Sequence, residues 1–559
     1  MPILNKKSGM NDNLGKYLAG ILILLLTIVL GLTVVLSCVP PVSRDALVHH
    51  LAIPKIYLEH GKIIELPCMV YSYYPMNLDM LYLAALYCGS DIAPKFIHAF
   101  FGLMTALLIY FYIKKRTNQI YALGGALLFL SLPIIIKLSI TVYVDLGLVF
   151  FSFASLLLLL KWIDTNFNLF YLVCSGICCG LAMGIKYNGL IVFFLFTMFV
   201  PYIYSKFSIE KSFVKSIQYG AVYILICLTL FSPWMIRNHI WKNNPVYPLY
   251  NKFFDLKADN PCITSLYREG KNINIDVLTY RTLMYEERWW EIALIPVRIF
   301  FQGKDNDLKN FDGKLSVLLF FFPVFAFKRS DFKYRHEKKI FLIFVVLFFL
   351  FVSFNAVLRL RYIAPIIPPL VILTIFGMKN CIDLFLLSSK ELLGKISIFI
   401  ILIGIGYQLI SSGTYLKEQF QYVKPFQFIT GKANKDQYIT MFRHEYPLLQ
   451  YINQNLPDSA KILFFYMGNR GYYCNKSYIA DMNSNILKLF DMLETKSITK
   501  VSNWYKTNGI THFAMNHLLV KKMVNSELDE VGKRRFLNFI SNFTINIVDN
   551  NGFELYELK

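Results

Sequence analysis

Long apolar runs recur along most of this chain and are separated by short polar links. Eleven runs are candidate membrane spans, near residues 17–37, 94–113, 119–136, 142–160, 168–185, 188–205, 216–236, 314–327, 339–357, 361–378 and 395–412. A helix needs roughly 20 apolar residues to cross a bilayer, and most runs approach that length, although the one at 314–327 is short. The pattern predicts a polytopic α-helical membrane protein with about 11 transmembrane helices.

The positive charges between these runs fall on one side of the membrane if the spans alternate. Lys6, Lys7 and Lys16 precede the first span, and the stretch KRSDFKYRHEKK at 328–339 follows the eighth. Cytoplasmic loops carry an excess of Lys and Arg, so residues 1–16 are predicted to be cytoplasmic. The opposite, outer face then receives three polar regions, at 38–93, 237–313 and 413–559.

The second of these outer regions contains YEERWWEIALIPVRIFF, at residues 285–301. Its aromatic and charged residues suit a helix that lies at the level of the lipid headgroups. Trp290 is a candidate for stacking on a sugar, although anchoring at the interface is the commoner role of such a side chain.

The composition becomes that of a soluble domain after residue 412. KILFFYM at 461–467 and ITHFAMN at 510–516 indicate buried strands with a helical stretch between them. FTINIV and FELYEL flank an Asp-Asn-Asn-Gly turn at 549–552, which is typical of a β-hairpin. We expect residues 17–412 to form the transmembrane domain and residues 413–559 a small extracytoplasmic α/β domain.

Composition supports a membrane location and excludes several functions. The 559 residues are 56% hydrophobic and 17% charged, with a net charge of +21. Lys and Arg lie in short runs between the apolar spans instead of gathering on one soluble face, so no nucleic acid is expected as a partner. The ten cysteines lack paired CxxC spacing and indicate neither a zinc site nor a disulfide framework. Motifs for ATP hydrolysis, zinc proteases and serine hydrolases are absent.

The first outer loop, residues 38–93, holds the most distinctive polar residues. It begins with PPVSRDALVHHLAIPKIY, in which Asp45 follows Arg44 and precedes His49 and His50. Asp45 is either a solvated loop acid paired with Arg44 or a general base that takes a proton from an attacking hydroxyl group. Each histidine is either a polar residue on a helix surface or a contact to a phosphate or a metal. Neighbouring histidines point in different directions on a helix, so at most one is expected to face a site.

Asp145 opens the fourth span, in the string TVYVDLGLVFF. An acid at a helix start is stabilised by the helix dipole, and this alone would account for Asp145. The alternative is a second acid that faces Asp45 across an outer cavity, where the two would hold a divalent metal ion or orient an acceptor. The sequence leaves both interpretations open, and no cofactor is assigned beyond this candidate metal ion.

Four cations lie at the outer ends of spans, where the positive-inside bias does not place them. They are Lys186, Arg237, Arg359 and Arg361. Any one of them can simply extend to the lipid headgroups. Four on one face are better explained by a phosphate or pyrophosphate whose charge must be neutralised as it leaves.

The order of several short motifs resembles that of a known family. The first-loop motif is followed by YVDLGLVFF, GLAMGIKYNGL, PWMIRNHIWKNNPVYP, FDGKLSVLLFFFP and RLRYIAPIIPPL. This order is similar to that of bacterial membrane glycosyltransferases of the C-type (GT-C) superfold, which are related to the protein O-mannosyltransferases and the lipid A aminoarabinose transferases. The resemblance covers roughly residues 15–412 and rests on the order of the motifs, because no single motif is highly specific.

The resemblance implies juxtamembrane helices in the first outer loop and transfer of a sugar from a polyprenyl-phosphate carrier, generally with inversion at the anomeric carbon. It maps the catalytic acid of the family onto Asp45, a second acid onto Asp145, and an arginine followed by a tyrosine onto Arg361. One departure concerns Tyr73-Tyr74-Pro75, where the aminoarabinose transferases have Glu-Lys-Pro. A lysine expected at the donor phosphate is missing here, so Lys186, Arg237 or Arg361 would supply the charge.

The expected function is that of an inverting glycosyltransferase in the bacterial inner membrane, with its active site facing the periplasm or the exterior. It would use a polyprenyl-phosphate sugar donor and a glycan, lipid or protein acceptor, in contact with membrane lipids. The expected cavity is lined by Arg44, His49, His50, Tyr73, Tyr74 and Tyr362. The alternatives are a polysaccharide polymerase or ligase, a transporter or flippase of lipid-linked sugars, and a non-catalytic glycan-binding factor.

Overall fold

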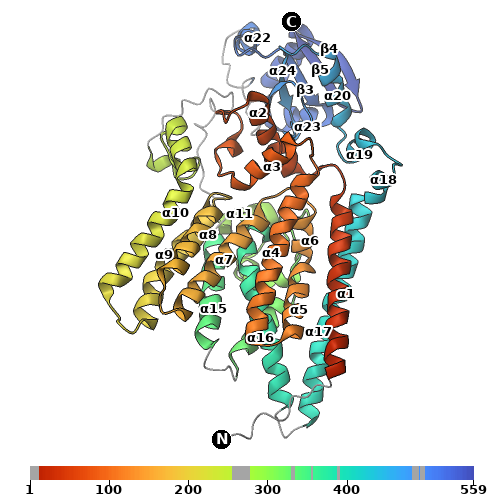
Figure 1. Cartoon of the computed structure of the whole chain (residues 1–559). Coiled ribbons are helices and arrows are strands. Elements are labelled where there is room, and N and C mark those ends of the chain that lie inside the picture. The colour runs from red at the N-terminus through yellow and green to blue at the C-terminus, as the bar shows by residue number, and fades with distance from the viewer. Residues whose placement is uncertain are drawn as a thin grey trace, which may run out of the picture.

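The computed structural model describes residues 12–254, 277–328, 334–353, 357–386, 391–480, 490 and 498–559. A bundle of long helices carries a small mixed sheet domain at one end, and the short helices of the first outer loop lie between the two (Figure 1). This arrangement confirms the predicted fold class, because helices cover the apolar runs and strands are confined to the C-terminal part of the described chain.

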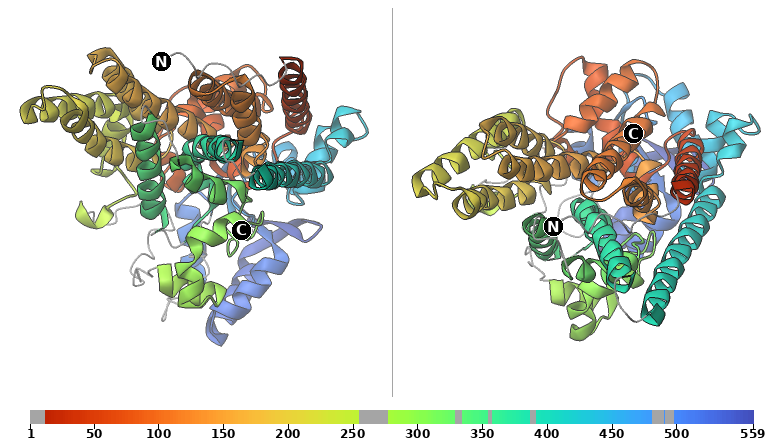
Figure 2. Two further views of the ribbon diagram at one scale, coloured as in Figure 1. Left: turned by 90° about the horizontal axis from the view of Figure 1, so that it is seen from below. Right: turned by 60° about the horizontal axis from the view of Figure 1, so that its bottom comes forward.

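Seven helices among the described residues are long and apolar enough to cross a membrane. They are α1 (Asp12–Ser37), α4 (Ala93–Arg116), α7 (Asp145–Asp164), α9 (Gly189–Phe207), α10 (Phe213–Lys242), η7 (Leu360–Ile366) continued by α16 (Ile367–Leu386), and the later part of α17 (Glu391–Val423). Seen from below, α9 and α10 extend to one side of the bundle and α17 lies on the other (Figure 2).

The remaining expected spans overlap helices that are bent, short or charged at one end. The run at 119–136 is two helices, α5 (Gln119–Leu130) and α6 (Pro133–Ser139), with a bend of 65° between them, so it is either a broken span or a re-entrant loop. Pro133 begins α6, and proline cannot continue the hydrogen-bond ladder of a preceding helix. The shorter helices are α8 (Leu169–Met183), α14 (Leu318–Phe321) with η5 (Phe322–Phe327), and α15 (Arg335–Ser353).

The centre of the bundle is built by α7 and α16. α7 lies against α4, α8 and η7, and α16 lies against η5 and α5. α16 approaches η5 closely at Gly377, where a Cβ atom would come within 1.9 Å of the Phe322 carbonyl oxygen. The packing fixes the start of α7 and the start of η7 side by side, which matters because Asp145 and Arg361 lie there.

The first outer loop folds into four short helices. These are η1 (Ala46–His50), α2 (Ala52–His60), η2 (Val70–Tyr73) and α3 (Asn77–Tyr87), and they lie under the C-terminal domain (Figure 1). The juxtamembrane helices implied by the family resemblance are therefore present. Gly61 ends α2 with a φ of 64°, a conformation that glycine adopts without strain. Cys68 in this loop is disulfide-bonded, a bond that the cysteine spacing in the sequence did not indicate.

The described part of the segment 237–313 begins within α10, which runs on to Lys242. It continues as η3 (Asn251–Phe253), α11 (Val277–Tyr285), α12 (Trp289–Ala293) and α13 (Ile295–Phe301). The predicted helix at 285–301 is thus two short helices, since Pro296 opens a new one. Trp289 and Trp290 are both exposed, as expected for residues at a membrane interface.

The C-terminal domain has a five-stranded sheet in the order β2-β1-β3-β5-β4. β1 (Lys461–Phe465) pairs in parallel with β2 (Ser477–Ala480) and β3 (His512–Asn516), whereas β4 (Thr544–Asn550) and β5 (Phe553–Leu558) form an antiparallel hairpin. Four of the strands match the sequence prediction, and β2 was missed. The helices α20 (Tyr446–Asn455), α22 (Ile498–Thr507), α23 (His517–Glu527) and α24 (Glu530–Phe543) belong to the sheet domain. α18 (Pro425–Ile429) and α19 (Lys435–Phe442) connect the helix bundle to it, and α18 contacts α1.

Candidate active site

A cavity of about 520 Å³, here called the catalytic cavity, lies where the helix bundle meets the first outer loop. It brings together segments that are far apart in the sequence: the start of η1, the link after η2, the link between α8 and α9, and the start of η7. The residues predicted for the site that line it are Arg44, Asp45, His49, His50, Tyr74, Lys186, Arg359, Arg361 and Tyr362. Tyr73, Asp145 and Arg237 are not among its lining residues.

Asp45 is paired with Arg361 in this cavity. The Asp45 Oδ2 atom lies 2.7 Å from Nη2 of Arg361, and 21% of the Asp45 side chain is exposed. The guanidinium also lies over the ring of Tyr143, 4.6 Å from its centroid. Burial raises the pKa of Asp45, but the Arg361 charge and hydrogen bond, together with His49 and His50, outweigh this effect and hold the pKa below its ordinary value. Asp45 is therefore a carboxylate at neutral pH, open to the cavity and opposed by a cation other than Arg44.

Asp145 is likewise paired with a cation, Lys186, and its side chain is more deeply buried than that of Asp45. The Lys186 ammonium donates to Asp145 Oδ1 at 2.7 Å and lies 5.0 Å from the ring centroid of Tyr362. The second carboxylate oxygen of Asp145 is buried without a hydrogen-bond partner. Asp145 thus lies in the first turn of α7 behind the cavity lining, and it contacts the cavity through Lys186.

Arg359 is held more loosely than Arg361. Its nearest carboxylate is Asp312, with Nη1 and Oδ2 separated by 3.9 Å, and its Nε atom is buried without a hydrogen-bond partner. Asp312 is engaged more closely by Lys137, at 2.8 Å. Arg359 therefore keeps hydrogen-bonding capacity that an anionic ligand can use.

Both histidines line the catalytic cavity. His49 stacks on Tyr71 with ring centroids 4.5 Å apart, and His50 Nδ1 lies 2.7 Å from Oδ1 of Asp79. Burial lowers the pKa of both histidines to about 3 and raises the pKa of Asp79 to about 8. His50 and Asp79 share a hydrogen bond and form a pair with no net charge beside Asp45.

Tyr73 and Arg237 support the cavity from outside its lining. The Tyr73 hydroxyl donates to Glu65 at 2.6 Å, and its ring is buried. Arg237 donates to the Tyr74 carbonyl oxygen at 3.1 Å and lies over the ring of Trp234. Arg237 thus fixes the backbone next to Tyr74, the aromatic residue that does face the cavity.

Sequence reasoning missed several lining residues. Asp79 carried a usable signal, since it is a lone acid within the apolar stretch MNLDMLYLAALY. Tyr71 and Asn188 carried no comparable signal. Asn469 comes from the C-terminal domain, in the turn after β1, and its φ of 59° belongs to the left-handed region that asparagine tolerates. The C-terminal domain therefore contributes directly to the cavity wall.

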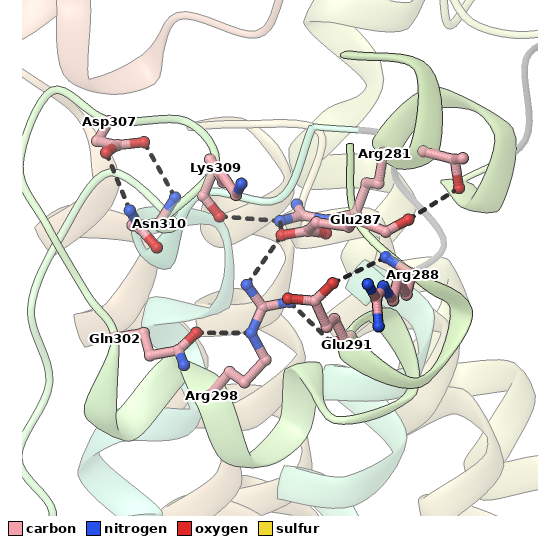
Figure 3. A network of polar contacts seen from close by, with 10 residues as sticks. Arg281, Glu287, Arg288, Glu291, Arg298, Gln302, Asp307, Lys309 and Asn310 are labelled. Atoms are coloured by element: carbon pink, nitrogen blue, oxygen red, sulfur yellow. Dashed lines mark hydrogen bonds and ion pairs between the residues drawn. The ribbon is translucent and has the colours of Figure 1, made fainter. Parts of the chain in front are cut away.

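A buried ionic network lies in the segment between α11 and α13 (Figure 3). Arg281 and Arg298 both bind Glu287, with 2.9 Å between the Nη2 atoms and Oε1, and Arg281 also donates to the Lys309 carbonyl oxygen. The Phe311 carbonyl accepts from Leu360 N–H at 2.8 Å, directly between Arg359 and Arg361. The network thereby positions the loop against which the cavity arginines rest.

Within the part of the chain that the structure describes, the one group of three candidate metal ligands is Asp164, His336 and Glu337. It lies at the opposite end of α7 from Asp145, and Glu337 is already bound by Arg116. Asp45 and Asp145 each face a cation, and this pairing competes with the metal binding considered from the sequence.

The fold is similar to those of solved membrane proteins. The chain superposes on ArnT from Cupriavidus metallidurans with a TM-score of 0.55, 12% sequence identity and coverage of 96% of this chain and 98% of that one. It also superposes on an oligosaccharyltransferase from Archaeoglobus fulgidus, with a TM-score of 0.52, 14% identity and coverage of 90% and 70%. The chain is therefore a multi-pass membrane protein with the GT-C glycosyltransferase fold.

A narrower match comes from sequence. Residues 59–242 match the profile of the dolichyl-phosphate-mannose-protein mannosyltransferase family. That stretch begins in α2 and ends with α10, and it includes Asp145 and Lys186. No curated protein sequence matches the chain significantly.

Proposed function

We propose that this protein transfers a sugar from a polyprenyl-phosphate donor to a glycan, lipid or protein acceptor on the outer face of the cytoplasmic membrane. The observation that carries the proposal is the Asp45–Arg361 contact in a cavity where membrane helices meet an outer domain. Lys186, which also lines this cavity, pairs with Asp145 behind the lining. The GT-C fold supports it, as do related structures described as bound to undecaprenyl phosphate and to dolichol phosphate.

Asp45 acts as the general base in this proposal. The acceptor oxygen attacks the anomeric carbon, its proton passes to the Asp45 carboxylate, and the bond from the anomeric carbon to the phosphate oxygen breaks with inversion. A carboxylate with a low pKa is a poor base while Arg361 neutralises it. When the donor phosphate draws Arg361 away, Asp45 loses its cation and becomes more basic, which couples donor binding to activation of the base.

The cavity cations neutralise the leaving polyprenyl phosphate. Arg361, Arg359 and Lys186 all line the cavity, and Arg359 is the most loosely paired of the three. Fixed cations that meet the charge as it develops lower the barrier because they need no reorganisation during the reaction. Arg237 holds the Tyr74 backbone in this scheme and takes no direct part.

The test compares Asp45→Asn with Asp91→Asn. Both acids belong to the first outer loop and both are paired, Asp91 with Lys435 at 2.7 Å, but only Asp45 lines the cavity. A strain that lacks the gene should accumulate the polyprenyl-phosphate sugar, detected by mass spectrometry of its lipids. The native chain and Asp91→Asn should clear it, whereas Asp45→Asn should slow transfer about 10²- to 10⁴-fold at an unchanged membrane level.

Other outcomes would replace the proposal. Retained transfer in Asp45→Asn removes this residue from the mechanism. Accumulation of a pyrophosphate-linked oligosaccharide would indicate a polymerase or ligase. Lipid-linked sugar that crosses reconstituted vesicles without being transferred would indicate a flippase.

A further inference from the structure

A second cavity, of about 540 Å³, lies between the first outer loop and the C-terminal domain. α2 and the chain around residues 64–69 form one side, and the start of β1 together with the approach to β2 forms the other. α2 lies directly beneath the sheet domain and away from the transmembrane helices (Figure 1). The volume falls within the range of about 300–1,000 Å³ that is typical of ligand sites.

The lining of this second cavity mixes apolar and hydrogen-bonding groups. Ile56, Ile64 and Leu66 are apolar, whereas Glu59, Asn475 and Ser477 can form hydrogen bonds. A sugar ring has the same mixture, with apolar C–H faces and hydroxyl groups around its edge. An acyl chain would leave the polar groups unsatisfied, and such groups are costly to bury.

The lysines of the second cavity already have hydrogen-bond or ion-pair partners within the protein. Lys55 donates to the carbonyl oxygens of Tyr472 and Cys474, each at 2.9 Å, and to Asn475 Oδ1 at 2.8 Å. Lys476 pairs with Asp458 at 2.6 Å, and Lys461 donates to the Asn508 carbonyl oxygen. A phosphate site would present free ammonium groups, so the lining favours a neutral polyhydroxyl ligand.

The two cavities share their walls. The first outer loop lines the catalytic cavity at residues 44–50, the second cavity at residues 52–69 and the catalytic cavity again at residues 71–79. The turn after β1 does the same, with Asn469 in the catalytic cavity and Gly471 in the second. Tyr472 N–H donates to the Leu47 carbonyl oxygen at 3.1 Å, which ties the two walls together beside Asp45.

We propose that the second cavity binds carbohydrate of the acceptor, namely sugar residues of a glycan chain beyond the one that is modified. The inference rests on the proposed function and narrows its acceptor to a glycan or a glycan-bearing molecule. The C-terminal domain and the first outer loop would together hold the chain while its reacting hydroxyl group lies in the catalytic cavity. Such remote binding energy can be used to orient the reacting group.

The experiment measures glycan binding to the detergent-purified full chain. The probe is the mixture of oligosaccharides that mild acid releases from the envelope of the source organism, labelled at the reducing end and followed by fluorescence anisotropy. Asn475→Trp and Glu59→Trp place an indole at exposed lining positions and should weaken binding at least tenfold. The matched controls Gln454→Trp and Lys62→Trp lie outside the lining at exposed positions and should bind like the native chain. Equal unfolding temperatures establish that all four variants are folded.

Each alternative result is decisive. The inference is overturned if the native chain shows no saturable binding, if the two plugging variants bind as well as the controls, or if inorganic phosphate displaces the probe. The two proposals also fail separately. Glycan binding that persists without any sugar transfer would reject only the proposed function, whereas transfer that proceeds while the tryptophan variants bind normally would reject only the second cavity as the acceptor site.

Discussion

Two clusters in this protein pair carboxylates with guanidinium groups, but they differ in how far they are exposed to solvent. In the catalytic cavity, Asp45 faces Arg361 with 21% of its side chain exposed. In the segment between α11 and α13, Glu287 is bound by both Arg281 and Arg298, and 0% of its side chain is exposed (Figure 3). The first cluster is open and has one cation per acid, whereas the second is sealed and has two.

This difference in exposure distinguishes a ligand-binding site from a structural ion pair. A sealed network can exchange its hydrogen bonds with nothing, so it acts only by holding the loop at Lys309 and Phe311. The open cluster can release Arg361 to an incoming anion, because solvent and substrate reach it. A lowered carboxylate pKa and a short ion pair occur in both settings, so access to a cavity is the more useful criterion.

Among the substitutions that test the contrast between the sealed and the open cluster, Glu287→Ala should have the largest effect, and that effect is on the free energy of unfolding. Glu287→Ala leaves two buried arginines without a partner carboxylate, and breaking a buried ion pair in this way costs about 3–5 kcal/mol. Denaturant unfolding of the detergent-purified chain measures this loss of stability. Glu286→Ala is the matched control, since Glu286 is the exposed neighbour and its loss should change the free energy of unfolding by about 0.5 kcal/mol or less. A similar small effect for both would mean that the network is not structural.

The next effect concerns the loosely held Arg359. Arg359→Gln should leave the unfolding temperature almost unchanged, because its contact with Asp312 spans 3.9 Å. Loss of a charged hydrogen bond to the donor phosphate should instead raise KM for the donor by about 10- to 100-fold. Lys304→Gln breaks a contact of the same length, with Asp307, outside the cavity and should alter neither quantity. An unchanged KM in Arg359→Gln would place the phosphate elsewhere.

The smallest effect depends on pH and involves Asp79. Its pKa is raised to about 8 from 3.8, so the folded state binds a proton that the unfolded state releases, and the free energy of unfolding falls as pH rises through this window. Asp79→Asn keeps a hydrogen-bond donor for His50 but cannot ionise. The free energy of unfolding of Asp79→Asn should therefore rise relative to that of the native chain between pH 6 and pH 8, by up to about 1 kcal/mol per pH unit. The unfolding temperatures of the two chains, measured across this pH range, report the difference. A constant difference would mean that Asp79 is already charged at pH 6.

Much of the candidate site could be predicted because its residues break a local pattern. Asp45, Lys186 and Arg361 are charges at the ends of apolar runs, and the positive-inside bias makes such cations unexpected on the outer face. Asp79 breaks the same pattern and could have been found. Asn469 could not, because a polar residue in a turn of a soluble domain violates no local rule.

The sequence alone predicted the polytopic helical fold and the small C-terminal α/β domain, because apolar periodicity is a local property that does not depend on distant segments. Only the tertiary structure decided which cation serves which acid. Arg361 pairs with Asp45, although Arg44 is adjacent in sequence, and Lys186 pairs with Asp145. The packing of η7 and the α8–α9 link against α7 brings these groups together across 316 and 41 positions, and no local pattern encodes contacts between segments so far apart.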